Sequence, residues 1–170
     1  IMKSYNSIPK YKEEHLGKHI WAFDKKDCSN FRVEWDRKLS KKSSFTNGFK
    51  KFGTRTELIL NNNNPFSVAI SIFENQHAER FDRIFTEAKE FRGVPRITVF
   101  GEFYGYGSFA GMHDWINDDF YLIFFDIFVF KKGLIPPADF MKLFEKLPIQ
   151  KLIYKGELTP EFIQRVETNE

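Results

Sequence analysis

The chain has little cysteine and no long hydrophobic run, and both shortages exclude classes of protein. One cysteine among 170 residues, Cys28, rules out an internal disulfide framework and favours a reducing, intracellular compartment. The N-terminal residues 1–19 hold no apolar signal core. The apolar run at 121–130 has the length of a buried strand, not of a membrane-spanning helix. The sequence therefore predicts a soluble, cytoplasmic protein without a membrane partner.

Phenylalanine, by contrast, is abundant. Its 21 residues, many of them inside strand-like runs, favour a β-rich core. A chain of this length with 42% hydrophobic residues can bury a sizeable core as a globular protein. The formal charge of +3 permits a polyanionic partner without requiring one.

The spacing of hydrophobic residues predicts an α+β fold around antiparallel sheets. Residues 30–36 alternate with the period of a half-buried strand, and we expect residues 54–60 to pair back against them. Residues 77–91 carry apolar side chains at helical spacing. Residues 96–105 and 119–130 are expected to form two buried strands. No repeat or internal linker is evident, which predicts a single domain over residues 1–170.

Turn and cap signals divide the remaining chain. The pair Asn47-Gly48 predicts a turn. The pair Pro136-Pro137 predicts a helix start, and Thr159 followed by Pro160 predicts another, with threonine as the N-cap. Residues 1–20 are expected to be irregular, apart from a short helix around 11–16.

The segment FDKKDCSN, residues 23–30, places Lys25, Lys26 and Asp27 directly before the first expected strand. A solvated charged turn explains these residues, and so does a nucleotide site built around an attacking lysine. Such a lysine must lose its proton before it attacks, which a neighbouring cation such as Lys26 favours. The segment by itself leaves both interpretations open.

Three further segments place polar residues in apolar surroundings. Arg55 lies in an expected strand, where a buried cation needs an anionic partner such as a phosphate. Glu102 follows a glycine near the end of an apolar strand, and Asp126 follows Phe125 in the most apolar run of the chain. A buried carboxylate needs a hydrogen-bond donor or a metal. Each residue taken singly also has a simpler explanation. Arg55 fits an exposed strand position, Glu102 fits a turn, and Phe125 fits simple core packing.

In this order, the segments FDKKDCSN, TRTELI, VFGEFYG and DFYLIFFDI resemble the first motifs of the covalent nucleotidyltransferases. The resemblance runs from about Trp21 to Val129 and is closest to ATP-dependent RNA ligases of the nick-sealing, RNA-editing type. It implies an antiparallel-sheet, ATP-grasp-like adenylation domain with flanking helices. It also implies ATP and Mg²⁺ or Mn²⁺ as cofactors and the ends of nicked or broken RNA as partners, while protein partners stay unknown.

The resemblance also implies roles for single residues. Lys25 matches the lysine that attacks the α-phosphate of ATP to form lysyl-AMP, after which AMP passes to an RNA 5′-phosphate and a 3′-hydroxyl seals the strands. Asn30 matches an asparagine that supports the phosphate and metal site, and Arg55 matches an arginine that contacts the nucleotide and the RNA end. Glu102 matches the glutamate that holds the ribose hydroxyls, and Phe125 the aromatic ring that stacks on adenine. The remaining candidates are Asp24, Lys26 and Asp27 for the nucleotide and Asp126 for the metal.

Two features depart from the family's pattern. Cys28 stands where the family has a glycine, which permits unusual backbone conformations and close approach to a ligand, so we expect this side chain to slow the reaction. The 170 residues also lack the family's later EGxVxK and KxK strands, and Lys155 does not replace them. We therefore expect an adenylation domain truncated before its last motifs. The alternative is a catalytically incomplete ligase-like module that binds nucleotide or RNA.

The choice of RNA as the substrate rests on the resemblance alone. A DNA ligase or a capping guanylyltransferase is a third possibility. The sequence motifs FGEF and FDI argue against it.

A basic segment follows the first expected strand. Residues 37–51 hold six Lys or Arg residues and no acid, interleaved with Phe45 and Phe49. Such a segment suits a nucleic-acid backbone and its bases, and equally a solvated hairpin tip. The candidate RNA-contacting residues are Lys38, Lys41, Lys42, Lys50 and Lys51.

Overall fold

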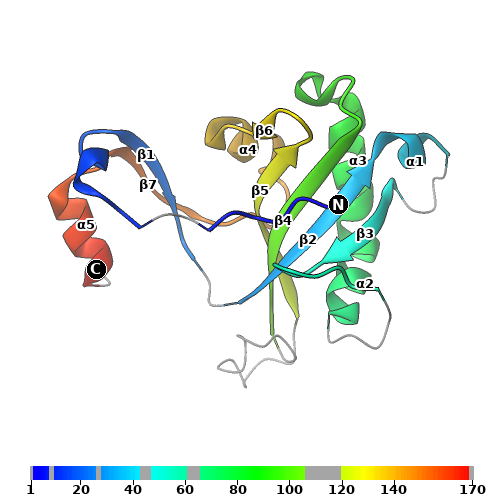
Figure 1. The fold of residues 1–170 in the computed structure, drawn as a ribbon, viewed down its shortest axis with the longest axis horizontal. Helices are drawn as coiled ribbons and strands as arrows, with labels where there is room; N and C mark the ends of the chain where they lie inside the picture. Colours follow the sequence, from blue (N-terminus) through cyan, green and yellow to red (C-terminus); the bar gives the residue numbers. More distant parts are fainter. Residues whose placement is uncertain are drawn as a thin grey trace. The chain divides into compact units, whose positions relative to one another are not determined.

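The computed structural model describes residues 2–7, 10–25, 28–42, 47–60, 66–105 and 120–168. The chain divides into two compact units, a larger one of Ile1–Tyr5 with Lys26–Ile149 and a smaller one of Asn6–Lys25 with Gln150–Glu170. Each unit holds one sheet, and the strand pairs in both are antiparallel (Figure 1). The prediction of a mixed fold around antiparallel sheets is thus confirmed.

The sheet of the larger unit has five strands. Its centre is the pair β2 (Ser29–Asp36) and β4 (Arg96–Tyr104), which run side by side over their length. Both strands match predicted ones, as does β5 (Tyr121–Val129) on the other side of β4. The edges are β3 (Phe49–Gly53), next to β2, and the two-residue β6 (Gly133–Leu134), next to β5.

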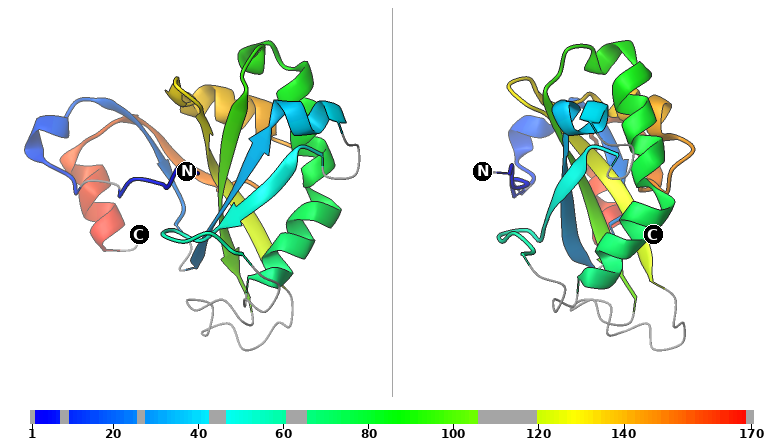
Figure 2. Two further views of the ribbon diagram at one scale, coloured as in Figure 1. Left: turned by 45° about the vertical axis from the view of Figure 1, so that its right-hand side comes forward. Right: turned by 90° about the vertical axis from the view of Figure 1, so that its right-hand side faces the viewer.

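One face of this sheet is covered by helices (Figure 2). They are α2 (Ser67–Gln76), α3 (Ala78–Glu87) and α4 (Pro137–Phe144), and a short 3₁₀ turn, η2 (Lys89–Phe91), follows α3. Helix α3 lies inside the range predicted from spacing, and α4 starts at the predicted proline. Helix α2 was not predicted.

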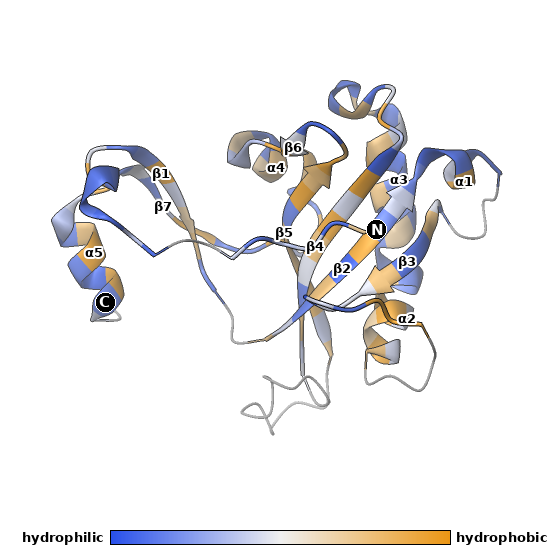
Figure 3. Ribbon diagram, viewed as in Figure 1, coloured by the Kyte–Doolittle hydropathy of each residue, from blue (hydrophilic) through white to orange (hydrophobic). Residues whose placement is uncertain are grey.

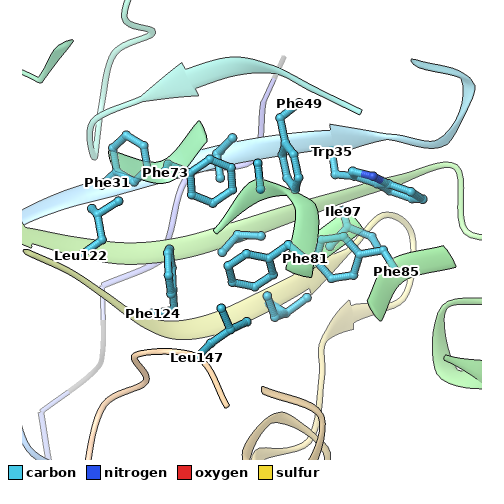
Figure 4. Packing of buried hydrophobic residues seen from close by; sticks show 14 of the residues in the cluster. Phe31, Trp35, Phe49, Phe73, Phe81, Phe85, Ile97, Leu122, Phe124 and Leu147 are labelled. Carbon is cyan, nitrogen blue, oxygen red and sulfur yellow. The ribbon is translucent and has the colours of Figure 1, made fainter. Parts of the chain in front are cut away.

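Phenylalanine rings fill the space between the helices and the sheet (Figure 4). Phe73 of α2 is fully buried, and its ring centroid lies 4.8 Å from that of Phe49 and 6.0 Å from that of Phe124. Phe81 of α3 contacts the same Phe124 ring at 4.8 Å. Each such side chain contributes about 1.5–3 kcal/mol by leaving water. The apolar stripes along β2, β4 and β5 that supply the sheet side of this core are visible in Figure 3.

A short helix, α1 (Arg37–Lys42), starts directly after β2. Asp36 caps it, because its Oδ1 accepts a hydrogen bond from the backbone N–H of Lys38 at 2.8 Å. The predicted turn at Asn47-Gly48 is present, with positive φ angles of 46° and 79°. The chain then enters β3 at once.

The expectation that residues 54–60 form the strand paired with β2 is wrong. That partner is β3, which ends at Gly53, before this segment. A tight turn follows, in which the N–H of Thr54 donates to the carbonyl of Glu57 at 2.9 Å and the Thr54 hydroxyl accepts from the Glu57 N–H. Only Leu58 makes an isolated bridge, back to Gly53.

The smaller unit pairs two strands that lie far apart in the sequence, β1 (His19–Phe23) and β7 (Leu152–Glu157). A 3₁₀ turn, η1 (Glu13–His15), matches the short helix expected near the N-terminus. Helix α5 (Pro160–Glu167) begins as predicted, with the Thr159 hydroxyl accepting from the N–H of Phe162 at 3.2 Å. None of the residues described in this unit is fully buried.

Candidate functional site

The face of the five-stranded sheet opposite α2 and α3, here called the distal face, carries the polar residues of the central strands. Successive strand side chains point to opposite faces, so the odd-numbered residues of β2 enter the core while the even-numbered ones reach the distal face. The register places Asn30 opposite Glu102, Arg32 opposite Phe100 and Glu34 opposite Thr98. Two candidates from separate motifs, Asn30 and Glu102, are thus direct neighbours.

A β-bulge in β5 brings two further candidates to the same face. Phe100 pairs with Asp126 but the next residue, Gly101, pairs with Phe124, so Phe125 is an extra residue in the ladder. Phe125 and Asp126 consequently both reach the distal face, although they are consecutive. Their contacts confirm this, because the ring of Phe125 lies near parallel to that of Phe100, with centroids 6.2 Å apart.

Gly101 suits this bulge because a side chain there would make tight contacts. A Cβ at this position would lie 3.0 Å from the carbonyl oxygen of Ile123 and 3.0 Å from the ring of Phe124. The glycine of the VFGEF motif therefore has a packing role beside the bulge.

Cys28 and Glu102 are linked directly. The thiol Sγ donates a hydrogen bond to Oε2 of Glu102 at 2.9 Å, and both side chains are half-buried. The residue that departs from the family's glycine therefore contacts the carboxylate that the resemblance assigns to the ribose. Next to them, Oδ1 of Asn30 is buried without a hydrogen-bond partner.

Asp126 is held by the N-terminal segment. Its Oδ2 accepts a hydrogen bond from the Tyr5 hydroxyl at 3.1 Å and its Oδ1 accepts from the N–H of Ile127 at 2.8 Å. Burial raises the pKa of Asp126 to about 6, although these two hydrogen bonds act in the opposite direction and lower it. Burial and the neighbouring carboxylate likewise raise the pKa of Tyr5, so the hydroxyl stays a donor. The Tyr5 ring also contacts Phe100 and Phe125 edge-on, at 4.9 and 5.0 Å.

Arg32 is the buried cation of this face, and sequence reasoning did not select it. Its side chain is only 3% exposed, Nη1 donates to the carbonyl of Met2 at 3.3 Å, and Nε has no hydrogen-bond partner. Burial lowers its pKa. The signal was available, because Arg32 alternates with the core residues of β2.

Arg55, the arginine that the sequence motif indicated, is not a buried strand residue. It lies exposed in the bend after β3, so the expectation that it is a buried cation on a strand is wrong. The physical reason is the turn closed by Thr54 and Glu57, which ends the ladder before Arg55.

Lys25 belongs to the smaller unit together with Asp24. The N–H of Asp24 donates to the carbonyl of Lys151 at 2.9 Å and thereby extends the pairing of β1 with β7 by one residue. Lys25 follows this last hydrogen bond and its side chain is exposed. Lys26 and Asp27 lie outside the described residues.

The candidate RNA-contacting lysines do not share one environment. Lys51 makes an ion pair with Glu34, with Nζ 2.7 Å from Oε1, and the Glu34 side chain is only 7% exposed. Arg37, from the same basic segment, donates to the carbonyls of Phe85, Phe91 and Val94 and so joins α1 to the end of α3. The other candidates, Lys38, Lys41, Lys42 and Lys50, are exposed.

Within the described residues, no group of three or more His, Cys, Asp or Glu side chains is arranged to hold a metal ion. Asp126 therefore belongs to no such group in this part of the chain. In the same described part, no helix is long and apolar enough to cross a membrane.

Comparison with known proteins identifies the fold. The chain is similar to a mutant RNA ligase of Naegleria gruberi in its apo form, with a TM-score of 0.61 and 15% identity over 92% of this chain and 42% of that one. It is also similar to a mutant Naegleria gruberi RNA ligase with ATP and Mn, with a TM-score of 0.55 and 16% identity over 86% of this chain and 39% of that one. No protein-family model and no curated protein matches.

These similarities show that the chain shares its fold with parts of two RNA ligase structures. The chain spans about two fifths of the length of the ligases it resembles.

Proposed function

We propose that this chain contains the adenylation domain of an ATP-dependent RNA ligase of the nick-sealing type. The observation that carries the proposal is the meeting of Asn30, Glu102 and Phe125 on the distal face of a sheet whose fold is shared with RNA ligases. The three residues come from three separate sequence motifs, and strand register and one bulge bring them to this face.

The chemistry of these residues suits a nucleotide. The ring of Phe125 is partly exposed and stacks on the buried ring of Phe100, so it offers an aromatic surface for adenine. The Glu102 carboxylate accepts hydrogen bonds only, as the two hydroxyls of a ribose require. The buried Oδ1 of Asn30 lacks a hydrogen-bond partner, which a bound ligand would supply.

We assign the attack to Lys25. Its neutral Nζ attacks the α-phosphorus of ATP, a P–N bond forms, the bond from that phosphorus to the bridging oxygen breaks, and pyrophosphate leaves as the lysine loses a proton. An oxygen of an RNA 5′-phosphate then attacks the same phosphorus, the P–N bond breaks, and the lysine nitrogen takes up a proton as it leaves. Finally, a 3′-hydroxyl attacks the RNA phosphate, loses its proton and expels AMP.

Magnesium or manganese fits this site as a partner of the substrate. Such ions are commonly held by one or two carboxylates together with substrate phosphates, and Asp126 supplies one carboxylate on the distal face. When bound, the metal neutralises charge on the phosphates. In this proposal Phe125 holds the base and Glu102 holds the ribose.

A second function is favoured by one observation. The thiol of Cys28 donates to Glu102 at 2.9 Å, so a proton donor already engages the carboxylate assigned to the ribose. This contact favours a ligase-like module that binds nucleotide or RNA without transferring AMP.

Transfer of label from ATP to RNA separates the two functions. The chain is incubated with Mg²⁺ and ATP labelled at the α-phosphate, freed of unbound nucleotide, and mixed with a nicked RNA duplex that carries either a 5′-phosphate or a 5′-hydroxyl at the nick. We expect covalent label on the protein that moves only to the 5′-phosphorylated RNA. Binding of ATP or of RNA without covalent label supports the module, and absence of binding to both contradicts both functions.

A further inference from the structure

A hollow lies on the distal face, toward the end of the central strands that is away from Asn30 and Glu102. Its volume is about 390 Å³, and its walls come from β2, β4, β5, the N-terminal segment and the turn after β5. Thr98 lies on its floor, four residues before Glu102 on β4, which corresponds to about 13 Å along the strand. The hollow is therefore separate from the candidate nucleotide site and lies on the same surface. The side chains used below are Lys3, Glu34, Arg96, Phe128, Phe130 and Lys131.

Cations lie over aromatic rings in this hollow. The guanidinium carbon of Arg96 is 4.0 Å from the ring centroid of Phe130, and Nζ of Lys131 is 5.6 Å from the same centroid. Nζ of Lys3 lies 5.5 Å from the centroid of Phe128. Each contact is within the range of a cation–π interaction, which holds the charge near the ring.

The lining has a positive balance. Glu34 is its single acidic side chain, against the cations of Lys3, Arg96 and Lys131. Glu34 is in addition paired with Lys51 at 2.7 Å. An anionic ligand therefore meets three cations and an acid whose charge is already balanced.

We propose that this hollow binds one unpaired nucleotide in a single-stranded segment of the RNA substrate, outside the paired region around the nick; the choice of RNA rests on the proposed function. Phosphate oxygens pair with lysine and arginine, and unstacked bases pack on aromatic rings and guanidinium planes. A volume of about 390 Å³ lies near the lower end of the range for small-molecule sites and admits one nucleotide rather than a duplex. A purely acidic peptide would use the cations and leave the two rings without a role.

Fluorescence anisotropy tests the proposal. It measures the binding of a 5′-phosphorylated, fluorescently labelled oligoribonucleotide to the chain over a range of salt concentrations. We expect Arg96→Gln and Lys131→Glu each to weaken binding about tenfold near 0.1 M salt and to lower the salt slope by about one. Phe128→Leu should weaken binding with an unchanged salt slope, because it removes stacking and no charge. Lys142→Glu, an exposed charge reversal on α4, is the matched control and should bind as the unaltered chain does.

Thermal unfolding of each variant shows that it is folded before its affinity is compared. Folded Arg96→Gln and Lys131→Glu variants with unaltered affinity overturn the proposal, and so does displacement of the RNA by polyglutamate at equal charge concentration. Adenylation of the unaltered chain is measured in parallel. If the chain is adenylated and the Arg96 and Lys131 variants bind RNA as the unaltered chain does, only the RNA site is contradicted. If these variants weaken RNA binding and the unaltered chain is not adenylated, only the proposed function is contradicted.

Discussion

The thiol of Cys28 and the carboxylate of Glu102 are joined by a hydrogen bond of 2.9 Å, in which Sγ donates to Oε2. The contact connects the segment before β2 with β4, and it places a proton donor on the carboxylate proposed to hold the ribose. Nucleotide and thiol therefore compete for Glu102 in this account.

Cys28→Gly should strengthen the binding of ATP several-fold, because it removes the competing donor. Cys28→Ser is the matched control, since its hydroxyl still donates to Glu102. Calorimetric titration of ATP into the three proteins gives the comparison. Equal affinities for the glycine and serine variants would show that the thiol does not compete with the nucleotide.

Asp126 should make stability depend on pH. Burial raises its pKa in the folded protein to about 6, above the ordinary value of 3.8, so between these values the folded state binds more protons than the unfolded state. The contribution of this protonation to the free energy of unfolding is complete below about pH 4 and is lost as the pH rises through 6. Relative to Asp126→Asn, the unaltered chain should gain on the order of 1–2 kcal/mol of unfolding free energy between pH 7 and pH 4.5.

Urea unfolding at the two pH values measures this gain, with Glu74→Gln as an exposed control. Tyr5→Phe sharpens the test, because the Tyr5 hydrogen bond lowers the pKa of Asp126, and its removal should move the transition to higher pH. A difference between the unaltered chain and Asp126→Asn that stays constant with pH would refute the assignment.

Lys51→Ala should destabilise the protein by about 1–3 kcal/mol, because it leaves the Glu34 carboxylate buried without its cation. Lys50→Ala removes the exposed neighbouring charge and should change stability little. Adding Glu34→Gln to Lys51→Ala should recover part of the loss. The denaturant midpoints of the unaltered chain, the two single lysine variants and the double variant give the comparison. Equal midpoints for the two single lysine variants would contradict a structural role for this ion pair.

Phe73→Ala should destabilise the larger unit by about 3–5 kcal/mol, since a fully buried ring between helix and sheet leaves a cavity. Glu74→Ala, the exposed neighbour on α2, should be close to neutral. Loss of the near-ultraviolet circular dichroism signal with temperature provides the measurement. A phenylalanine variant as stable as the glutamate variant would show that α2 does not close the core.

Local patterns predicted the elements whose side chains alternate or cap clearly. Strands β2, β4 and β5, helix α3 and the threonine cap of α5 were visible because burial on one face, or one hydrogen bond, determines the residue types. Helix α2 was not predicted, because the β-branched residues Val68, Ile70 and Ile72 suit a strand as well as a buried helix. Strand β7 gave no comparable signal, since its pairing with β1 joins distant parts of the chain.

The candidate site was predictable in its residue types and not in its contacts. Glu102 and Phe125 were selected from their motifs, and register and bulge place both on the distal face. Arg55 was misplaced because the segment around it has strand-like composition, whereas a turn at Thr54 ends the ladder. The contact of Tyr5 with Asp126 spans 121 positions, and no local pattern reports such a pairing.

Intact mass spectrometry of the chain after incubation with ATP and Mg²⁺ tests the central claim most directly. We predict a gain of one AMP that is absent in Lys25→Ala and retained in Lys18→Ala, an exposed lysine of the smaller unit directly before β1. An adduct that persists in folded Lys25→Ala, or no adduct on a chain that binds ATP, would contradict Lys25 as the nucleophile of an adenylyl transfer.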